Sequence, residues 1–345
     1  MPGRLRPLTA TFCMQGGSRS QVVVISSGSH PGDGGRMLTR RTFLAATAGA
    51  VVATGAAPRA TQTRERGMYV SLNGSLTRQM PWPDFVRLAS KLGYGGVDVN
   101  FTAAKAEGVD ATRAMLKELR LIPAVCNLPV PYASADEAAY ADAMKTLDEN
   151  AAFANAIGLN RMMVVLSPSS TMPKAARAAF LESRLTPISE TLRRHQIRLG
   201  LEFLGVLSMR QNPKSPEPFI WTLPETVAFA REIGPNIGVV LDAWHWHLSG
   251  GTAPEIVAAG KDAIVHVHIS DAKPAPAADI RDNHRVMPGE GQIDLIGFLQ
   301  ALKKIGYADG ISPEPLGRVP AEMSAEEGAK RGFETTLAVM KKAGV

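Results

Sequence analysis

Eight short apolar segments, separated by longer stretches with helical spacing, most limit what this chain can fold into. The segments span residues 67–72, 96–100, 122–127, 161–166, 197–203, 237–242, 264–269 and 310–314. Several are β-branched and bounded by glycine, proline or asparagine, as β-strands are. Between them, apolar residues recur every three or four positions, for example over 85–92, 140–157 and 295–305, which predicts helices. The alternation predicts a parallel sheet with helical crossovers.

Eight repeats favour a closed (β/α)8 barrel, the TIM barrel, over an open doubly wound sheet. No Gly-x-Gly-x-x-Gly follows the first predicted strand, which argues against a dinucleotide-binding version of the open sheet. Leucine-glycine or isoleucine-glycine pairs predict helix C-caps at Gly93, Gly158, Gly234 and Gly306. No internal repeat or linker divides the body, so we expect residues 61–345 to form a single α/β domain.

The first 60 residues have the character of a leader. Arg40 and Arg41 precede an apolar or small-residue run over 43–57, and small residues at its end offer cleavage sites. This pattern predicts a twin-arginine signal peptide over 37–60, read by the twin-arginine export machinery, and a periplasmic or secreted mature protein. The run is shorter than the ~20 residues of a spanning helix, so no membrane anchor is expected. Residues 1–36 are predicted to be disordered or a misassigned start; the alternative is a cytosolic protein in which Arg-Arg precedes an alanine-rich helix by chance.

The charge distribution argues against nucleic-acid binding. Residues 1–60 hold seven of the 38 basic residues and one of the 32 acidic ones, which leaves 31 of each in the body. Proteins that bind nucleic acid normally carry a basic face of their own. Of the two cysteines, Cys13 lies in the leader and Cys126 in the body, so the body forms no internal disulfide.

Four consecutive predicted strands end in a group that can bind a metal. Glu202, Asp242, His268 and Glu314 lie at or near the ends of the fifth to eighth segments. In a barrel of this kind the active site forms where the strands end. An apolar strand ending in a carboxylate or imidazole is costly unless that group is paired or metal-bound. The pattern predicts one divalent metal ion, with Mn²⁺ favoured and Co²⁺, Mg²⁺ or Zn²⁺ as alternatives.

Histidines cluster in the same part of the chain. Five of the six in the body fall within residues 245–284. His266 and His268 share one face of their strand, since residues two apart in a strand point the same way. We assign His268, the one nearer the strand's end, to the metal and interpret His266 as a hydrogen-bonded core residue. Asp271 is either a partner of the ligands or an ordinary loop acid.

Three motifs carry a family resemblance when they are taken together. They are VVLDAWHWHLSGG from Val239, VHVHISDA from Val265, and RVMPGEGQIDLIGFLQALKKIGYADGISPEPL from Arg285. They resemble the xylose isomerase-like TIM barrel family of sugar isomerases and epimerases, with the resemblance extending over about residues 67–343. Pro313 and the additional Trp246 and His247 depart from the family's pattern.

The resemblance implies a single divalent metal held by Glu202, Asp242, His268 and Glu314. In the ketose 3-epimerase branch the two glutamates also form the acid/base pair, which implies proton transfer through an enediolate intermediate. It further implies that His245 and Arg285 bind a small sugar or keto-sugar substrate. The residues alone leave Arg285 open between orienting substrate and a solvated loop position. Trp244 is predicted to stack on the sugar, with hydrophobic packing as the alternative.

Other functions on the same barrel remain open from the sequence. A lyase, dehydratase or hydrolase acting on a keto-sugar or inosose could use the same metal and glutamates. An endonuclease IV-type nuclease is disfavoured, because the first four predicted strands supply no histidine and the body is neutral. A non-catalytic sugar-binding protein is disfavoured by the presence of both glutamates. The sequence does not fix the substrate or the oligomeric state.

Overall fold

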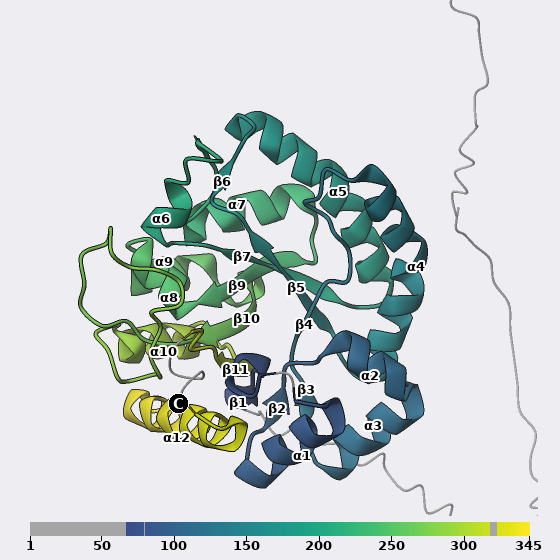
Figure 1. The fold of residues 1–345 in the computed structure, drawn as a ribbon, viewed down its shortest axis with the longest axis vertical. Helices are drawn as coiled ribbons and strands as arrows, with labels where there is room; N and C mark the ends of the chain where they lie inside the picture. The colour runs from purple at the N-terminus through teal and green to yellow at the C-terminus, as the bar shows by residue number, and fades with distance from the viewer. Residues whose placement is uncertain (1–66, 79, 318–322) are drawn as a thin grey trace, which may run out of the picture. The chain divides into compact units, whose positions relative to one another are not determined.

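The computed structural model describes residues 67–78, 80–317 and 323–345. Nine strands in this part of the chain form one parallel sheet (Figure 1). They are β1 (Tyr69–Leu72), β2 (Gly96–Val97), β3 (Ile122–Pro123), β4 (Cys126–Asn127), β5 (Arg161–Leu166), β7 (Arg198–Phe203), β9 (Ile237–Asp242), β10 (Ile264–Ile269) and β11 (Gly310–Pro313). Their order in the sheet is β3-β2-β1-β11-β10-β9-β7-β5-β4. The predicted leader lies outside the described residues.

The sheet closes because its two ends belong to one chain segment. β3 pairs with β2 and β4 pairs with β5, and only two residues separate β3 from β4. Around the gap, Ala124 N donates to Val97 O (2.8 Å) and Val99 N donates to Val125 O (2.7 Å). Residues 122–127, predicted as one strand, therefore pair with β2 at their start and with β5 at their end. The closed barrel predicted from the sequence is confirmed.

Helices surround the barrel on its outside, as Figure 1 shows. They are α1 (Trp82–Leu92), α2 (Phe101–Glu107), α3 (Val109–Glu118), α4 (Glu137–Ala156), α5 (Lys174–Arg194), α6 (Leu207–Arg210), α7 (Leu223–Ile233), α8 (Ala243–Leu248), α9 (Ala253–Ala259), α10 (Leu295–Lys304) and α12 (Ala325–Ala343), with short 3₁₀ turns at Gly74–Leu76 and Lys261–Ala263. Side-chain caps define several starts. In α12, Ser324 and Glu327 form a reciprocal capping box.

The predicted glycine stops have two different causes. Gly93, Gly158 and Gly306 have φ of 90°, 83° and 76°, the left-handed region that glycine enters at little cost. Gly93 is itself the C-cap, whereas Gly158 and Gly306 each lie one residue beyond it. Gly234 caps α7 in an extended conformation. A side chain there would meet Ser189 Oγ at 2.4 Å, so close packing favours glycine at this position. The C-cap predicted at Gly234 is confirmed, although the residue is extended and not left-handed.

The core occupies two regions. Most buried side chains pack between the strands and the helices. Val125, Met163 and Val240 form a separate cluster, as expected for side chains that fill a barrel interior. A short antiparallel pair, β6 (Ser169–Ser170) with β8 (Glu217–Pro218), lies in the loops that follow β5 and β7 and was not predicted from the sequence.

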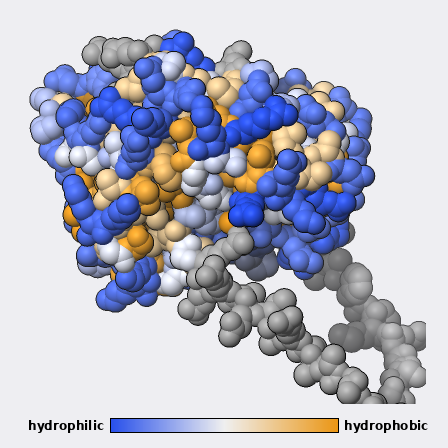
Figure 2. Space-filling model, turned by 90° about the horizontal axis from the view of Figure 1, so that it is seen from below, coloured by the Kyte–Doolittle hydropathy of each residue, from blue (hydrophilic) through white to orange (hydrophobic). Residues whose placement is uncertain are grey.

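The surface carries hydrophobic residues between hydrophilic ones, and Figure 2 shows one face where they gather toward the middle. Val165, on β5, is 46% exposed and borders the cavity described below. Its exposure follows from that position. No helix in the described ranges combines the length and hydrophobicity needed to cross a membrane.

Candidate metal centre

The barrel brings the four predicted metal ligands together. Glu202 is the penultimate residue of β7, Asp242 ends β9, His268 lies in β10, and Glu314 follows β11. In the sheet register His268 is opposite Asp242. One ligand atom from each of the four residues lies within 4.8 Å of the others. Adjacent parallel strands therefore converge on one point at their carboxyl ends.

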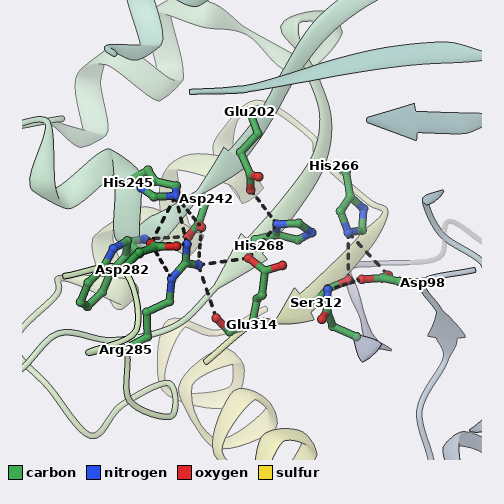
Figure 3. Close-up of polar contacts among 12 residues, drawn as sticks. Asp98, Glu202, Asp242, His245, His266, His268, Asp282, Arg285, Ser312 and Glu314 are labelled. Carbon is green, nitrogen blue, oxygen red and sulfur yellow. Dashed lines mark hydrogen bonds and ion pairs between the residues drawn. The ribbon is translucent and has the colours of Figure 1, made fainter. Parts of the chain in front are cut away.

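His268 is the centre of this group (Figure 3). Its Nδ1 atom lies 2.8 Å from Glu202 Oε1 and 3.4 Å from Glu314 Oε2. The imidazole is 1% exposed and Glu202 is 4% exposed. Nδ1 thus faces the carboxylates, which is the orientation needed to share a metal ion with them.

Burial and mutual attraction shift the pKa values in opposite directions. Burial raises the pKa of Glu202 to about 7, against the lowering effect of His268. Burial would also raise the pKa of Glu314, but His268 and Arg285 lower it to about 2. Burial alone would lower the pKa of His268, but Glu314 and Glu202 raise it well above the usual value. Without a metal, His268 therefore carries a proton that compensates for the buried carboxylates.

The donor set fits one divalent cation. Three carboxylates and one imidazole offer mainly oxygen donors, as Mn²⁺ and Mg²⁺ prefer, with one nitrogen that Co²⁺ or Zn²⁺ also accept. A cluster of buried carboxylates is costly in the absence of a compensating charge. A cation at this point would compensate the same charges that the His268 proton offsets in the metal-free protein.

Metal affinity is expected to rise with pH between about 6 and 8. A ligating imidazole must be neutral and a ligating carboxylate ionised, yet the raised pKa values keep protons on His268 and Glu202 near neutrality. Each proton released on binding makes the affinity rise about tenfold per pH unit. Titration calorimetry in two buffers of different ionisation enthalpy counts these protons. Affinity for Mn²⁺ that stays flat over this range contradicts ligation by these groups.

Arg285 joins the metal ligands to a second layer of side chains. Its Nη1 donates to Asp242 Oδ2 (2.6 Å) and to Glu314 Oε2 (3.1 Å). Its Nη2 donates to Asp282 Oδ1 (2.8 Å) and to His245 Nε2 (3.0 Å). Burial lowers the pKa of His245 to about 4, so the ring is neutral and accepts this hydrogen bond. Arg285 is 2% exposed, and the solvated loop position considered for it is wrong.

A folded loop places Arg285 in the site. Asp271 and Val286 exchange two backbone hydrogen bonds of 3.0 and 2.9 Å. The buried Asp271 carboxylate accepts from Gly289 N (3.0 Å) and Ile293 N (2.9 Å). Gly289 has φ +82°, as expected for a turn. Asp271 therefore holds the loop that carries Arg285, and does not contact the metal ligands itself among the contacts described.

A cavity of about 680 Å³ opens next to the metal ligands. Glu202, His268 and Glu314 line one part of it. Neutral polar residues, one acid and one arginine line the part formed by the first strands, namely Asn73, Ser75, Arg78, Asp98, Asn100, Thr102 and Asn127. Asp98 was not predicted from the sequence, although a carboxylate directly after the apolar strand β2 is the same signal that predicted the candidate metal ligands.

The model of the xylose isomerase-like TIM barrel family matches residues 86–341. The chain belongs to this family. Among curated relatives, the inosose isomerase of Halalkalibacterium halodurans is 28% identical over 242 residues, 69% of this chain and 82% of the relative. The L-ribulose 3-epimerase of Mesorhizobium japonicum is 27% identical over 52% of this chain and 56% of the relative.

A solved member shows that the whole barrel is shared. The xylose isomerase domain protein of Alicyclobacillus acidocaldarius superposes with a TM-score of 0.74 at 26% identity. The match covers 81% of this chain and all of that protein. The chain is therefore similar to these proteins over the barrel that carries the candidate metal centre.

Within this xylose isomerase-like barrel, the three residues predicted to bind substrate lie behind the metal ligands. Trp244 and His245 are each 1% exposed, and neither they nor Arg285 are among the residues that line the described cavity. The Arg285 guanidinium carbon lies 5.6 Å from the centre of the Trp244 ring. Trp246 packs on Phe298 at 5.2 Å between ring centres. The structure thus brings Arg285 and His245 to the ligands, and their contact with substrate stays a prediction.

Proposed function

We propose that this protein is a divalent-metal-dependent isomerase or epimerase of a keto-sugar or inosose, working by proton transfer through an enediolate. The observation that carries the proposal is that Glu202 and Glu314 border the same cavity and both approach His268 Nδ1, at 2.8 and 3.4 Å. The names of two relatives, inosose isomerase and L-ribulose 3-epimerase, support this class of reaction. Mn²⁺ is the metal we propose, with Co²⁺, Mg²⁺ and Zn²⁺ as alternatives.

The two glutamates can act as a proton-transfer pair. A divalent ion held by Glu202, Asp242, His268 and Glu314 would polarise a carbonyl and the neighbouring hydroxyl of a bound substrate. This would acidify the C–H bond of the hydroxyl-bearing carbon next to the carbonyl. One glutamate takes that proton and the other returns a proton. Return to the opposite face of the same carbon gives epimerisation, and return to the neighbouring carbon gives isomerisation.

Arg285 supports this pair by holding two of the carboxylates. Its hydrogen bonds fix Asp242 Oδ2 and Glu314 Oε2, and each carboxylate has a second oxygen that is not used by this contact. The guanidinium does not titrate near neutrality, since burial would lower its pKa but Asp242 and Glu314 raise it. Arg285 therefore keeps its carboxylate partners in place while protons move at the glutamates.

Metal analysis tests the proposal first. The purified protein is expected to contain about one Mn, Co, Mg or Zn ion per chain by elemental analysis. His268→Ala and Glu314→Gln are expected to lower this content sharply, because each removes or neutralises one donor. Absence of metal in every preparation, with thermal stability unchanged on adding Mn²⁺, would reject the metal site.

Deuterium exchange tests the chemistry on the same preparations. Incubation of keto-sugars and inososes in deuterated water is expected to replace one carbon-bound hydrogen of the true substrate, as measured by NMR. A product that has lost one water molecule relative to the substrate would favour a dehydratase. No reaction with any keto-sugar or inosose by the metal-loaded protein would reject the proposed class.

A further inference from the structure

Asp98 stands at the opposite side of His268 from Asp242 and Arg285 (Figure 3). It follows β2, borders the cavity and has 12% of its side chain exposed. Its Oδ1 accepts hydrogen bonds from Ser71 Oγ (2.9 Å) and Ser312 Oγ (2.8 Å), and its Oδ2 accepts one from Asn73 Nδ2 (2.9 Å). The carboxylate is therefore held rigidly at the cavity wall by neutral donors.

The donors that hold Asp98 are themselves fixed. The Ser312 hydroxyl gives its hydrogen to Asp98, so its oxygen is free to accept one from His266 Nε2 at 2.9 Å. Ser71 is fully buried, and so is His266. This chain of contacts leaves the carboxylate little freedom to rotate. Rigid placement of a polar group in a cavity is what recognition of one substrate atom requires.

The carboxylate has room for one more hydrogen bond. An ionised carboxylate accepts about four hydrogen bonds, and three are made within the protein. The remaining position belongs to Oδ2, which has Asn73 as its one donor among the described residues. Burial raises the pKa of Asp98, whereas His268 and the three donors lower it. In its ionised form the carboxylate accepts only, so it completes its set with a donor such as a hydroxyl group.

The wall next to Asp98 is mainly neutral and suits hydroxyl groups better than a phosphate. Asn100, Asn127 and Thr102 are neutral, and no lysine is present in the described lining. Arg78 is the arginine in that lining, and its Nη2 lies 3.4 Å from Met323 O. Phosphate recognition normally relies on Arg or Lys side chains or on helix N-termini. A phosphate beside Asp98 would meet a like charge.

We propose that Asp98 recognises a substrate hydroxyl beyond the reacting carbons, and that the substrate is an uncharged polyhydroxylated keto-sugar or inosose. The inference rests on the proposed function and names the substrate class of that site. It makes Asp98 a specificity-determining residue. Removing the carboxylate then affects binding and discrimination more than the proton-transfer step.

A mutant and analogue cycle tests the proposal. Wild-type protein and Asp98→Asn are compared on the best keto-sugar or inosose found by deuterium exchange and on its series of monodeoxy analogues. In the wild type, one deoxy analogue is expected to lose about 10- to 100-fold in kcat/KM, since a hydroxyl bound to a charged group is lost. In Asp98→Asn that penalty is expected to shrink to within about threefold, with KM for the full substrate raised about tenfold.

Binding of unreactive polyols gives a readout that does not depend on turnover. Calorimetry with a sugar alcohol matched to the substrate is expected to show about tenfold weaker binding to metal-loaded Asp98→Asn. The phosphate ester of the substrate is expected to bind the wild type less well than the free sugar. Tighter binding of the phosphate ester would overturn the uncharged-substrate part of the proposal.

Controls separate the possible failures. Asp110→Asn, at a carboxylate whose side chain is 91% exposed, is expected to change none of these values. If Asp98→Asn does not fold, Ser71→Ala keeps the carboxylate but loosens it, and is expected to reduce the same deoxy penalty about threefold.

Two results overturn the role of Asp98 while the proposed function stands. One is a wild type that exchanges deuterium but shows no deoxy penalty. The other is loss of a metal equivalent in Asp98→Asn, which would make Asp98 a metal ligand. A wild type without exchange on any keto-sugar or inosose instead rejects the proposed function itself.

Discussion

Replacement of Glu202 by glutamine is expected to lower turnover and deuterium exchange by about 10²- to 10⁴-fold. Glutamine has nearly the same shape and keeps one oxygen that can face a cation, but it cannot take up a proton. Glu202 is 4% exposed to bulk solvent and borders the cavity, where it can reach a bound substrate. Exchange is measured by NMR at saturating Mn²⁺, and elemental analysis of the same sample reports whether metal is still bound.

The control for this variant is Glu217→Gln. Glu217 lies in β8, in the loop after β7, and is exposed, so its replacement is expected to leave exchange unchanged. Glu202→Gln that keeps both its metal and its exchange rate would show that Glu202 is a ligand only. If Glu202→Gln loses both exchange and metal, the Mn²⁺ concentration is raised. Exchange that returns at high Mn²⁺ was lost through weaker metal binding, whereas exchange that stays absent was lost with the base.

The barrel was predictable because its signals are local. Each main strand is an apolar run with a polar residue at or next to its end, and the observed bounds of β5, β9 and β10 agree with the predicted segments. The same signal identified Glu202, Asp242, His268 and Glu314, since parallel strands of a barrel end at one rim. The division of residues 122–127 into β3 and β4 was not visible, because it depends on where neighbouring strands diverge.

Asp98 was missed because its significance is non-local. The donors that hold it come from Ser71, Asn73 and Ser312, which lie 27, 25 and 214 residues away in the sequence. An isolated acid after a short strand has many possible roles until these donors are seen to converge. The closed barrel places its last strand beside its first, which brings Ser312 near Asp98, but the sequence does not show which side chains then meet.

His245 and Trp244 illustrate a different limit. Asp242 ends β9 and caps the start of α8 by accepting from Trp244 N (2.8 Å). The chain therefore turns into a helix at the candidate metal ligand itself, and the next residues are buried behind it. The family motif places Trp244 and His245 near the site. Whether they face the cavity or lie behind Asp242 depends on this turn.

Replacement of Arg285 by methionine is expected to destabilise the metal-free protein by roughly 3–5 kcal/mol. Methionine has a similar length but leaves the buried Asp242 and Glu314 carboxylates without their cation. Uncompensated buried charge is the costly outcome when one partner of a buried ion pair is removed. At roughly 2–4 °C for each kcal/mol, the midpoint temperature of thermal unfolding, followed by circular dichroism, should fall by about 10 °C.

Mn²⁺ is expected to narrow the difference in stability between Arg285→Met and the wild type, because a bound cation compensates the same carboxylates and stabilises only the folded state. Arg113→Met is the matched control: Arg113 is 60% exposed, pairs with Asp110 on the surface, and should show no measurable shift. Equal stability of Arg285→Met and wild type without metal would show that the guanidinium does not compensate the ligands. A shift that Mn²⁺ leaves unchanged would instead show that Arg285 acts through Asp282 and its loop, and that the metal ligands are held independently of it.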